Sequence, residues 1–110
     1  MTLREQIVEL LQLLSSEKEQ IDYEDNVRHV DVTLELISMW FDDLYHPKLG
    51  DLEALFGENE LIALEEFSNF YESKLKDLPQ SNGTVKTWHH CPAWKDVMLK
   101  AKQTLEFIND

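Results

Sequence analysis

The sequence predicts an all-α fold, in the form of a four-helix bundle with irregular connections. Apolar residues recur at spacings of three and four along several stretches, which is the period of an amphipathic helix. Only 3 glycines and 3 prolines occur in 110 residues, so few positions interrupt these stretches. Apolar residues make up 43% of the chain and charged residues 29%, which is typical of a globular protein. A single domain over 1–110 is long enough to bury its own core.

The first helix is expected to follow Thr2. Thr2 and Glu5 have the spacing of a capping box, in which a hydroxyl and a carboxylate bind the free amides of a helix start. The polar run SSEKEQ is expected to end or bend this helix. Its buried face would consist of Leu3, Ile7, Leu10, Leu11 and Leu14.

A long second helix is predicted over 23–44, because its apolar residues alternate spacings of four and three. This first stripe consists of Tyr23, Val27, Val30, Leu34, Ile37, Phe41 and Leu44. A second stripe on the far side consists of Val32, Leu36, Met39 and Trp40. A helix that is apolar on two faces is usually buried, so this one is predicted to be central. Alternatively, the second stripe is a surface for a partner.

The segment HPKLGDLEALFGENE is expected to be a connector with a short helix near 51–56, because proline and two glycines interrupt the apolar pattern. A further helix is predicted to begin at Glu58 or Asn59. Its buried face would contain Leu61, Leu64, Phe67, Tyr71, Leu75 and Leu78, with Phe70 at the edge.

Pro79 is expected to end that helix. The segment 79–91 is predicted to be an irregular loop or a short hairpin, because Asn82-Gly83 favours a tight turn. Pro92 suits the first position of the last helix, where its missing amide hydrogen costs little. The buried face of this helix would consist of Trp94, Val97, Met98, Ala101, Leu105 and Ile108.

The segment TWHHCPAW places His89, His90 and Cys91 between Trp88 and Trp94. The histidines and the cysteine are potential metal ligands, and Cys91 is a potential nucleophile. The companion ligands of a zinc site and an orienting base are not apparent from the sequence. We therefore expect no metal, no cofactor and no enzymatic activity, with a small enzyme using these three residues as an alternative. Structurally, the tryptophans would close the bundle end and the histidines would lie at its polar edge.

The formal net charge is −12, and the stretch from Asp31 to Glu72 contains 11 acids and one base, Lys48. Such a surface repels nucleic acid and anionic lipid and attracts cationic proteins. We therefore expect neither nucleic acid nor a membrane among the partners. The alternative is that the acidity only keeps the protein in solution. A single cysteine and the absence of a signal-like start favour the cytoplasm.

A surface for a basic protein is predicted around SMWFDDLYHP, residues 38–47, because aromatic residues lie beside carboxylates there. The connector that follows contributes more acids. The predicted partner-binding residues are Glu35, Trp40, Asp42, Asp43, Tyr45, Asp51, Glu53, Glu58 and Glu60.

In size, charge and the layout of LELISMWFDDLYHP with ENELIALEEFSNFYESKLKDLP, the chain resembles the small acidic helical immunity proteins of bacteria, including those of contact-dependent inhibition systems. The resemblance implies a one-to-one complex that neutralises a basic toxin, such as a nuclease. A nucleic-acid mimic is an alternative, although its acids would need to be spaced like phosphates. An oligomeric accessory subunit using Val32, Leu36 and Met39 is another. The chain itself is expected to be a monomer or a weak dimer.

Overall fold

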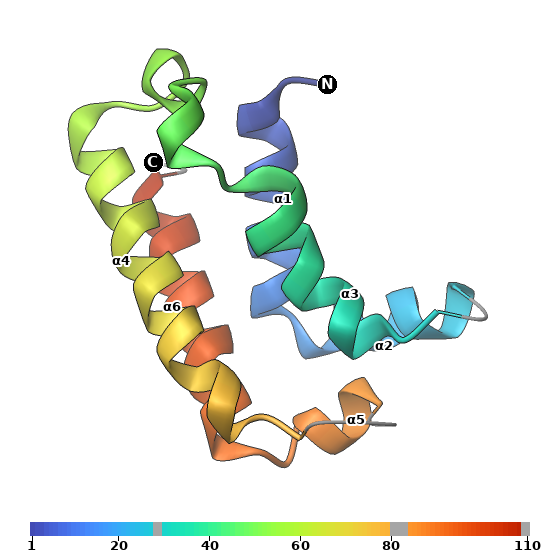
Figure 1. The fold of residues 1–110 in the computed structure, drawn as a ribbon. Helices are drawn as coiled ribbons and strands as arrows, with labels where there is room; N and C mark the ends of the chain where they lie inside the picture. Colours follow the sequence, from blue (N-terminus) through green and yellow to red (C-terminus); the bar gives the residue numbers. More distant parts are fainter. Residues whose placement is uncertain (28–29, 80–83, 109–110) are drawn as a thin grey trace.

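The computed structural model describes residues 1–27, 30–79 and 84–108, and every regular element in these ranges is helical (Figure 1). The predicted all-α fold is therefore confirmed. The α-helices are α1 (Leu3–Ser15), α2 (Glu17–Asn26), α3 (Val32–Ser38), α4 (Glu58–Lys74), α5 (Val85–Trp88) and α6 (Pro92–Ile108). The π-helix η1 (Met39–Leu44) continues α3, and the 3-10 turns are η2 (Pro47–Leu49), η3 (Leu52–Ala54) and η4 (Leu75–Asp77). No helix within the described ranges is long and apolar enough to cross a membrane.

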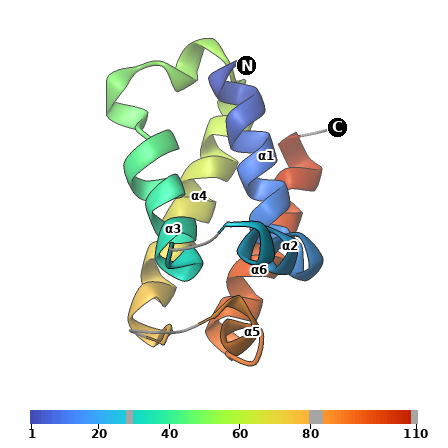
Figure 2. The ribbon, with the colours of Figure 1, turned by 90° about the vertical axis from the view of Figure 1, so that its right-hand side faces the viewer.

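Four helical rods lie side by side, namely α1, α3 with η1, α4 and α6 (Figures 1 and 2). Helix α6 packs against α1 on one side and α4 on the other, while η1 packs against α1. The short helices α2 and α5 contact each other at one end, and the connector between η1 and α4 lies at the opposite end. The arrangement differs from a regular four-helix bundle because one rod changes helix type and two further helices cover an end.

Helix α1 forms as the sequence predicts. The Thr2 hydroxyl accepts a hydrogen bond from the Glu5 amide at 3.1 Å, so the capping residue satisfies a free donor of the first turn. The polar run ends α1 at Ser15, and the Ser16 hydroxyl caps the next helix by accepting from the Glu19 amide at 3.1 Å. The buried residues of α1 are Ile7, Leu10, Leu11 and Leu14, which were all expected on its apolar face.

The prediction of one long helix over 23–44 is wrong. Helix α2 ends at Asn26, and α3 starts only after Asp31. An Asp31 carboxylate oxygen accepts from the Leu34 amide at 3.3 Å, so Asp31 caps a new helix instead of continuing the previous one. Aspartate and β-branched residues are poor in helix interiors, and aspartate is favoured at helix starts. These local preferences outweigh the apolar spacing.

Both apolar stripes of this region were expected to be buried, but only the second stripe is largely buried. In the second stripe, Val32 is 2% exposed and both Leu36 and Trp40 are fully buried. In the first stripe, Val30 is 45% exposed and Leu34 is 54% exposed. Val32, Leu36 and Trp40 therefore belong to the core and are not available to a partner or to a second copy of the chain, whereas Met39 of the same stripe is only half-buried.

The π-helix η1 follows from the packing of Trp40. The Tyr45 amide donates to the Trp40 carbonyl at 2.9 Å, five residues back, so this turn is wider than an α-helical one. The wide turn aligns the two side chains, whose rings stack with centroids 4.9 Å apart. The Trp40 indole also donates to the Ser68 hydroxyl at 3.2 Å and meets the edge of Phe67.

The second half of the chain follows the prediction except at two places. Helix α4 was expected to continue to Pro79, but it ends at Lys74 and the 3-10 turn η4 follows it. The 3-10 turn η3 lies inside the expected 51–56 segment, α4 begins at Glu58, and Pro92 is the first residue of α6. The Asn82-Gly83 pair lies outside the described residues. The part of 79–91 that is described contains α5 and no strand, so the hairpin is wrong for this part. Thr84 caps α5 by accepting from the Thr87 amide at 3.2 Å.

The buried apolar residues form one cluster to which all four rods contribute. Aromatic rings run through it in a chain of pairwise contacts with centroids 4.6 to 5.9 Å apart. Such contacts stabilise a core beyond the burial of their area alone. In the order of their contacts, these aromatic residues are Trp40, Phe67, Tyr71, Trp94 and Trp88.

Candidate functional site

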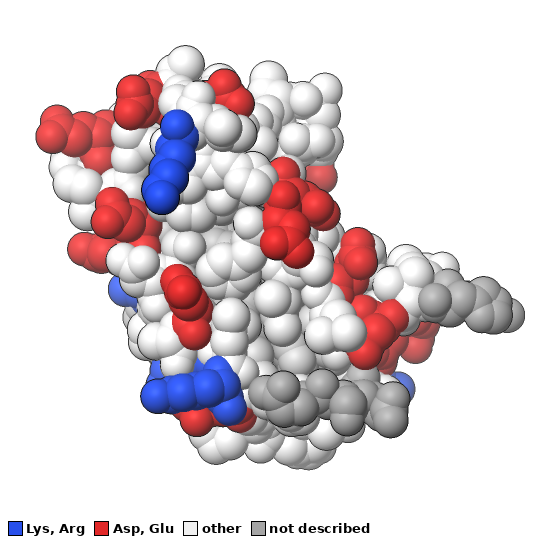
Figure 3. Space-filling view, viewed as in Figure 1, with Lys and Arg blue, Asp and Glu red and all other residues white. Residues whose placement is uncertain are grey.

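The nine predicted partner-binding residues do not form a single cluster. The exposed ones are Asp42, Asp43, Asp51, Glu53 and Glu58, spread over η1, the connector and the start of α4. Glu35 lies elsewhere, near Tyr23 of α2, whose pKa is raised mainly by burial and also by the Glu35 charge. Figure 3 shows acidic side chains in separate groups over one face, with uncharged surface between them. The acidity is therefore a distributed field and not one dense patch.

Three of the nine residues are held by contacts within the chain. Trp40 is fully buried, so its side chain is not part of a binding surface. Tyr45 is half-buried against it, and burial raises the Tyr45 pKa, with a smaller effect from the Glu65 charge. Glu60 accepts two hydrogen bonds from the Arg4 guanidinium, at 3.0 and 3.1 Å. These bonds and one from the Gly57 amide lower the Glu60 pKa.

One of the predicted acids lines a hollow of about 350 Å³ between α1 and η1. We call this hollow the acidic groove. From the α1 side come Met1, Gln6, Glu9, Leu10 and Leu13, and from η1 come Met39, Asp43 and Leu44. Of these eight side chains, five are apolar, two are carboxylates, and none is basic.

Local structure explains how the acidic groove is built. Gln6, Leu10 and Leu13 recur at helical spacing, which places them along one edge of α1. On the other wall, the wide turn of η1 separates Met39 from Leu44 by five residues, so both reach the same hollow. Glu9 and Asp43 are both exposed and belong to opposite walls. The result is an apolar floor with a carboxylate on each side.

The acidity continues along α1. Glu9 and Leu13 also line a second hollow, of about 530 Å³, between α1 and α2. Glu19 and Asp22 contribute two more carboxylates there, of which Asp22 pairs with Lys18 at 3.0 Å. A partner seated in the acidic groove would therefore find further negative charge beside it.

The acidic groove is suited to a long cationic side chain. Lysine and arginine have an apolar stem that buries well and a charged end that prefers a carboxylate. Methionine adapts its shape to irregular partners, and Met1 and Met39 both line the hollow. We therefore regard this groove, with the neighbouring Asp42, as the candidate site.

The segment TWHHCPAW is part of the core and of the end of the bundle. Trp88 and Trp94 are buried as expected, at 1% and 0% exposure. His89 is only 8% exposed, so the prediction that both histidines are edge residues is wrong for it. Its Nε2 lies 2.8 Å from the Gln20 side-chain oxygen, whereas Cys91 donates to the Asp77 carbonyl at 3.6 Å. Among the described residues, no group of three or more His, Cys, Asp or Glu side chains is placed to hold a metal.

Sequence reasoning missed most of the acidic groove. Glu9 appeared only as one of many acids, and no local pattern indicated the π-helix that brings Leu44 beside Met39. A signal was present in the aromatic residues at positions 40 and 45, whose spacing of five fits a wide turn. The pairing of α1 with η1 depends on tertiary packing, which no local spacing reveals.

No family model, no curated protein and no solved structure matches this chain.

Proposed function

We propose that this protein binds a basic protein partner and neutralises it, as an immunity protein does with its toxin. The observation that carries the proposal is the acidic groove, where Glu9 and Asp43 flank an apolar floor. The groove would take a lysine or arginine of the partner. The net charge of −12 would steer such a partner toward the surface before contact.

The distribution of charge favours a protein over a small cation. Exposed acids extend from the acidic groove to the connector, including Asp42, Asp51 and Glu53, so attraction acts over a wide area. Binding strength in protein interfaces is concentrated in a few side chains that fill pockets, while the charges around them mainly speed association. The acidic groove supplies the pocket and the remaining acids supply the field.

The resemblance to bacterial immunity proteins suggests that the partner is a toxin domain. A nuclease is a suitable type of toxin because it must present lysine and arginine to hold phosphates. If one of these side chains enters the acidic groove, it is no longer available to nucleic acid. Inhibition would then need no chemical reaction by the immunity protein itself.

The test compares two double variants with the same change in net charge. Glu9→Lys with Asp43→Lys alters the acidic groove, whereas Glu72→Lys with Glu106→Lys alters exposed acids on α4 and α6. The first step is to search upstream of this gene for a large secreted toxin with a basic C-terminal domain; that domain is then the ligand, and binding is measured by titration calorimetry. We expect the groove variant to lose about tenfold or more in affinity, since a pocket contact is lost as well as charge.

Protection is measured alongside binding, by growth of cells that express the toxin domain with each variant. The wild type and the Glu72, Glu106 variant should protect, and the groove variant should not. Equal losses of affinity in both double variants would show that only total charge matters, which would contradict the acidic groove as the site. Absence of binding by the wild type would overturn the proposed function.

A further inference from the structure

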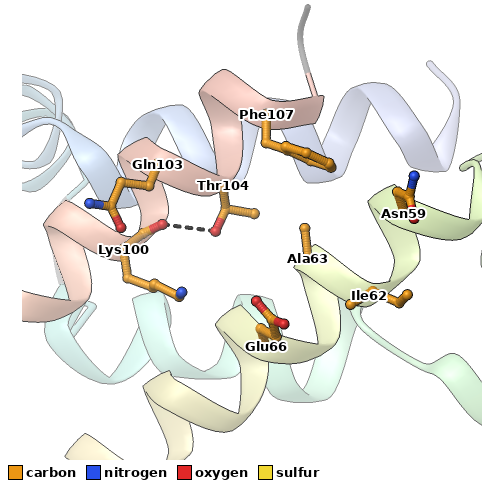
Figure 4. Close-up of a pocket in the computed structure, with 8 residues that line it drawn as sticks. All are labelled: Asn59, Ile62, Ala63, Glu66, Lys100, Gln103, Thr104 and Phe107. Atoms are coloured by element: carbon orange, nitrogen blue, oxygen red, sulfur yellow. Dashed lines mark hydrogen bonds between the residues drawn. The ribbon is translucent and has the colours of Figure 1, made fainter.

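A third hollow, of about 450 Å³, lies between α4 and α6 and shares no lining residue with the acidic groove (Figure 4). We call it the mixed groove because its walls carry one acid and one base. Its lining residues are Asn59, Ile62, Ala63 and Glu66 from α4, and Lys100, Gln103, Thr104 and Phe107 from α6.

The mixed groove is flanked by exposed apolar side chains. Ile62 is 50% exposed and Phe107 is 52% exposed, one on each wall. Leu99, at 56% exposure, lies on α6 in the same row of residues as Gln103 and Phe107. Three of the seven large apolar side chains that are exposed in the described structure therefore gather at this face. Such gatherings indicate an interaction surface.

The two charged residues of the mixed groove lie at the midpoints of their helices. Glu66 is the middle residue of α4 and Lys100 is the middle residue of α6. The two helices run in opposite directions, so these residues lie at the same level across the hollow (Figure 4). Neither forms an ion pair with another residue that the structure describes.

We propose that the mixed groove binds a second copy of this chain. In a dimer with twofold symmetry every contact occurs twice. If one residue of the first copy contacts a second residue of the other copy, the same two residues are also in contact with the copies exchanged. With the twofold axis running along the groove, α4 of one copy faces α6 of the other. Glu66 of each copy then faces Lys100 of the other copy, and the four charges alternate in sign. The opposite choice, with the axis across the groove, would place Glu66 against Glu66.

The overall charge also favours this face for self-association. Two chains of charge −12 repel each other, so they should meet where the acidity is least. The lining of the mixed groove carries one acid and one base, Glu66 and Lys100, whereas the lining of the acidic groove carries two acids and no basic side chain. A strongly basic partner is less suited to this face because Lys100 lines it. Ile62 and Phe107 supply the apolar contact that a dimer needs at its centre.

The test uses two single charge reversals that complement each other. Glu66→Lys would place lysine against lysine across the interface, and Lys100→Glu would place glutamate against glutamate. We expect light scattering to give twice the monomer mass of 13.0 kDa for the wild type and the monomer mass for each variant alone. An equimolar mixture of the two variants should recover the dimer mass, since every charge again faces its opposite. A loss caused by misfolding would not be recovered by mixing.

Apolar contact is tested with substitutions at matched exposure. Phe107→Ser should weaken the dimer at least tenfold in sedimentation equilibrium, whereas Leu34→Ser, at 54% exposure on α3, should leave it unchanged. A wild type that stays monomeric at the highest attainable concentration would overturn the proposal. So would a dimer that persists in both single charge variants, because it would have to use another face.

Discussion

Gln20 is the residue on which the end of the bundle near α2 and α5 depends. It is fully buried, and its side-chain nitrogen donates to the carbonyl oxygens of Leu13 and Leu14 at 3.0 and 3.1 Å. Its oxygen accepts from the Trp94 indole at 3.1 Å and lies 2.8 Å from His89 Nε2. One polar side chain thus links the end of α1 to α6 and to the turn before it. A buried polar group of this kind is stabilising only when all its bonds are formed.

This network fixes the hydrogen position on His89. Because the Gln20 oxygen can only accept, His89 must donate from Nε2, which leaves Nδ1 without a hydrogen in the neutral ring. Nδ1 lies 3.6 Å from an oxygen of Glu17. Burial lowers the His89 pKa, and the neighbouring His90 charge lowers it further, while Glu17 and Glu24 oppose this effect. The net effect of these groups is a lowered pKa, so the fold favours the neutral ring.

The lowered His89 pKa predicts a loss of stability in mild acid. The unfolded chain takes up a proton near pH 6.5, whereas the folded chain resists it, so protons favour unfolding. The free energy of unfolding should therefore be highest above about pH 6.5 and should fall from there down to the folded-state pKa. Urea denaturation across this range measures the slope. His89→Gln should flatten it, and His90→Gln, which alters an exposed neighbour, should keep it. Parallel slopes for the wild type and His89→Gln would contradict this assignment.

At the scale of helices, the sequence predicts elements well where one apolar face is flanked by polar residues. The buried residues of α1, and most of those of α6, lie at the expected positions, and so do the starts of α4 and α6. The failure occurs in 23–44, where both faces are apolar and spacing alone cannot tell which is buried. Asp31 carried the missing signal, since it is a strong helix-capping residue within an otherwise continuous pattern.

Arg4 joins four segments that are distant in the sequence. Its guanidinium donates to Glu60, to the Leu55 carbonyl at 2.9 Å and to the Ile108 carbonyl at 3.0 Å. It also lies over the Phe56 ring, 4.7 Å from the centroid. The start of α1, the connector, the start of α4 and the end of α6 are therefore held together by one planar group.

Arg4→Lys is predicted to destabilise this end of the molecule despite keeping the charge. Lysine cannot make the paired bonds to Glu60 and the two carbonyl bonds together, nor stack flat on Phe56. We expect a loss of about 1 to 2 kcal/mol in the free energy of unfolding. The loss should be close to the lower of these values, because Arg4 is partly exposed and solvent screens its interactions. Urea denaturation measures it. The control is Lys18→Ala, which removes an exposed pair with Asp22 and should change stability little. Equal effects of the two substitutions would show that Arg4 acts only as a surface charge.

At the scale of the whole molecule, charge and shape are predictable to different degrees. The sequence alone establishes the net charge and shows that acidic residues are concentrated between Asp31 and Glu72. It does not reveal that Trp40 is inside, or that Glu60 is held by Arg4, because both follow from contacts between distant segments. The acidic groove and the mixed groove each lie between two helices for the same reason. Two surfaces of different charge character then predict two different responses to salt.

Association with a basic partner and self-association are predicted to respond to salt in opposite directions. Salt screens the attraction of a −12 chain for a cationic protein, so the association rate should fall as ionic strength rises. Salt also screens the repulsion between two such chains, so the dimer should strengthen, because its apolar contacts and short charge pairs are screened less. Stopped-flow fluorescence with the partner and sedimentation equilibrium without it measure the two effects.

Charge reversal at exposed acids outside both grooves separates these effects further. Asp42→Lys with Glu53→Lys removes two negative charges and adds two positive ones at exposed positions. The association rate with the basic partner should fall and depend less on salt, while the dimer should become stronger at low salt since the net repulsion is smaller. A rate that does not change with ionic strength in the wild type would contradict electrostatic steering. A dimer weakened by the double variant would show that these acids lie in the dimer interface, contrary to its placement on α4 and α6.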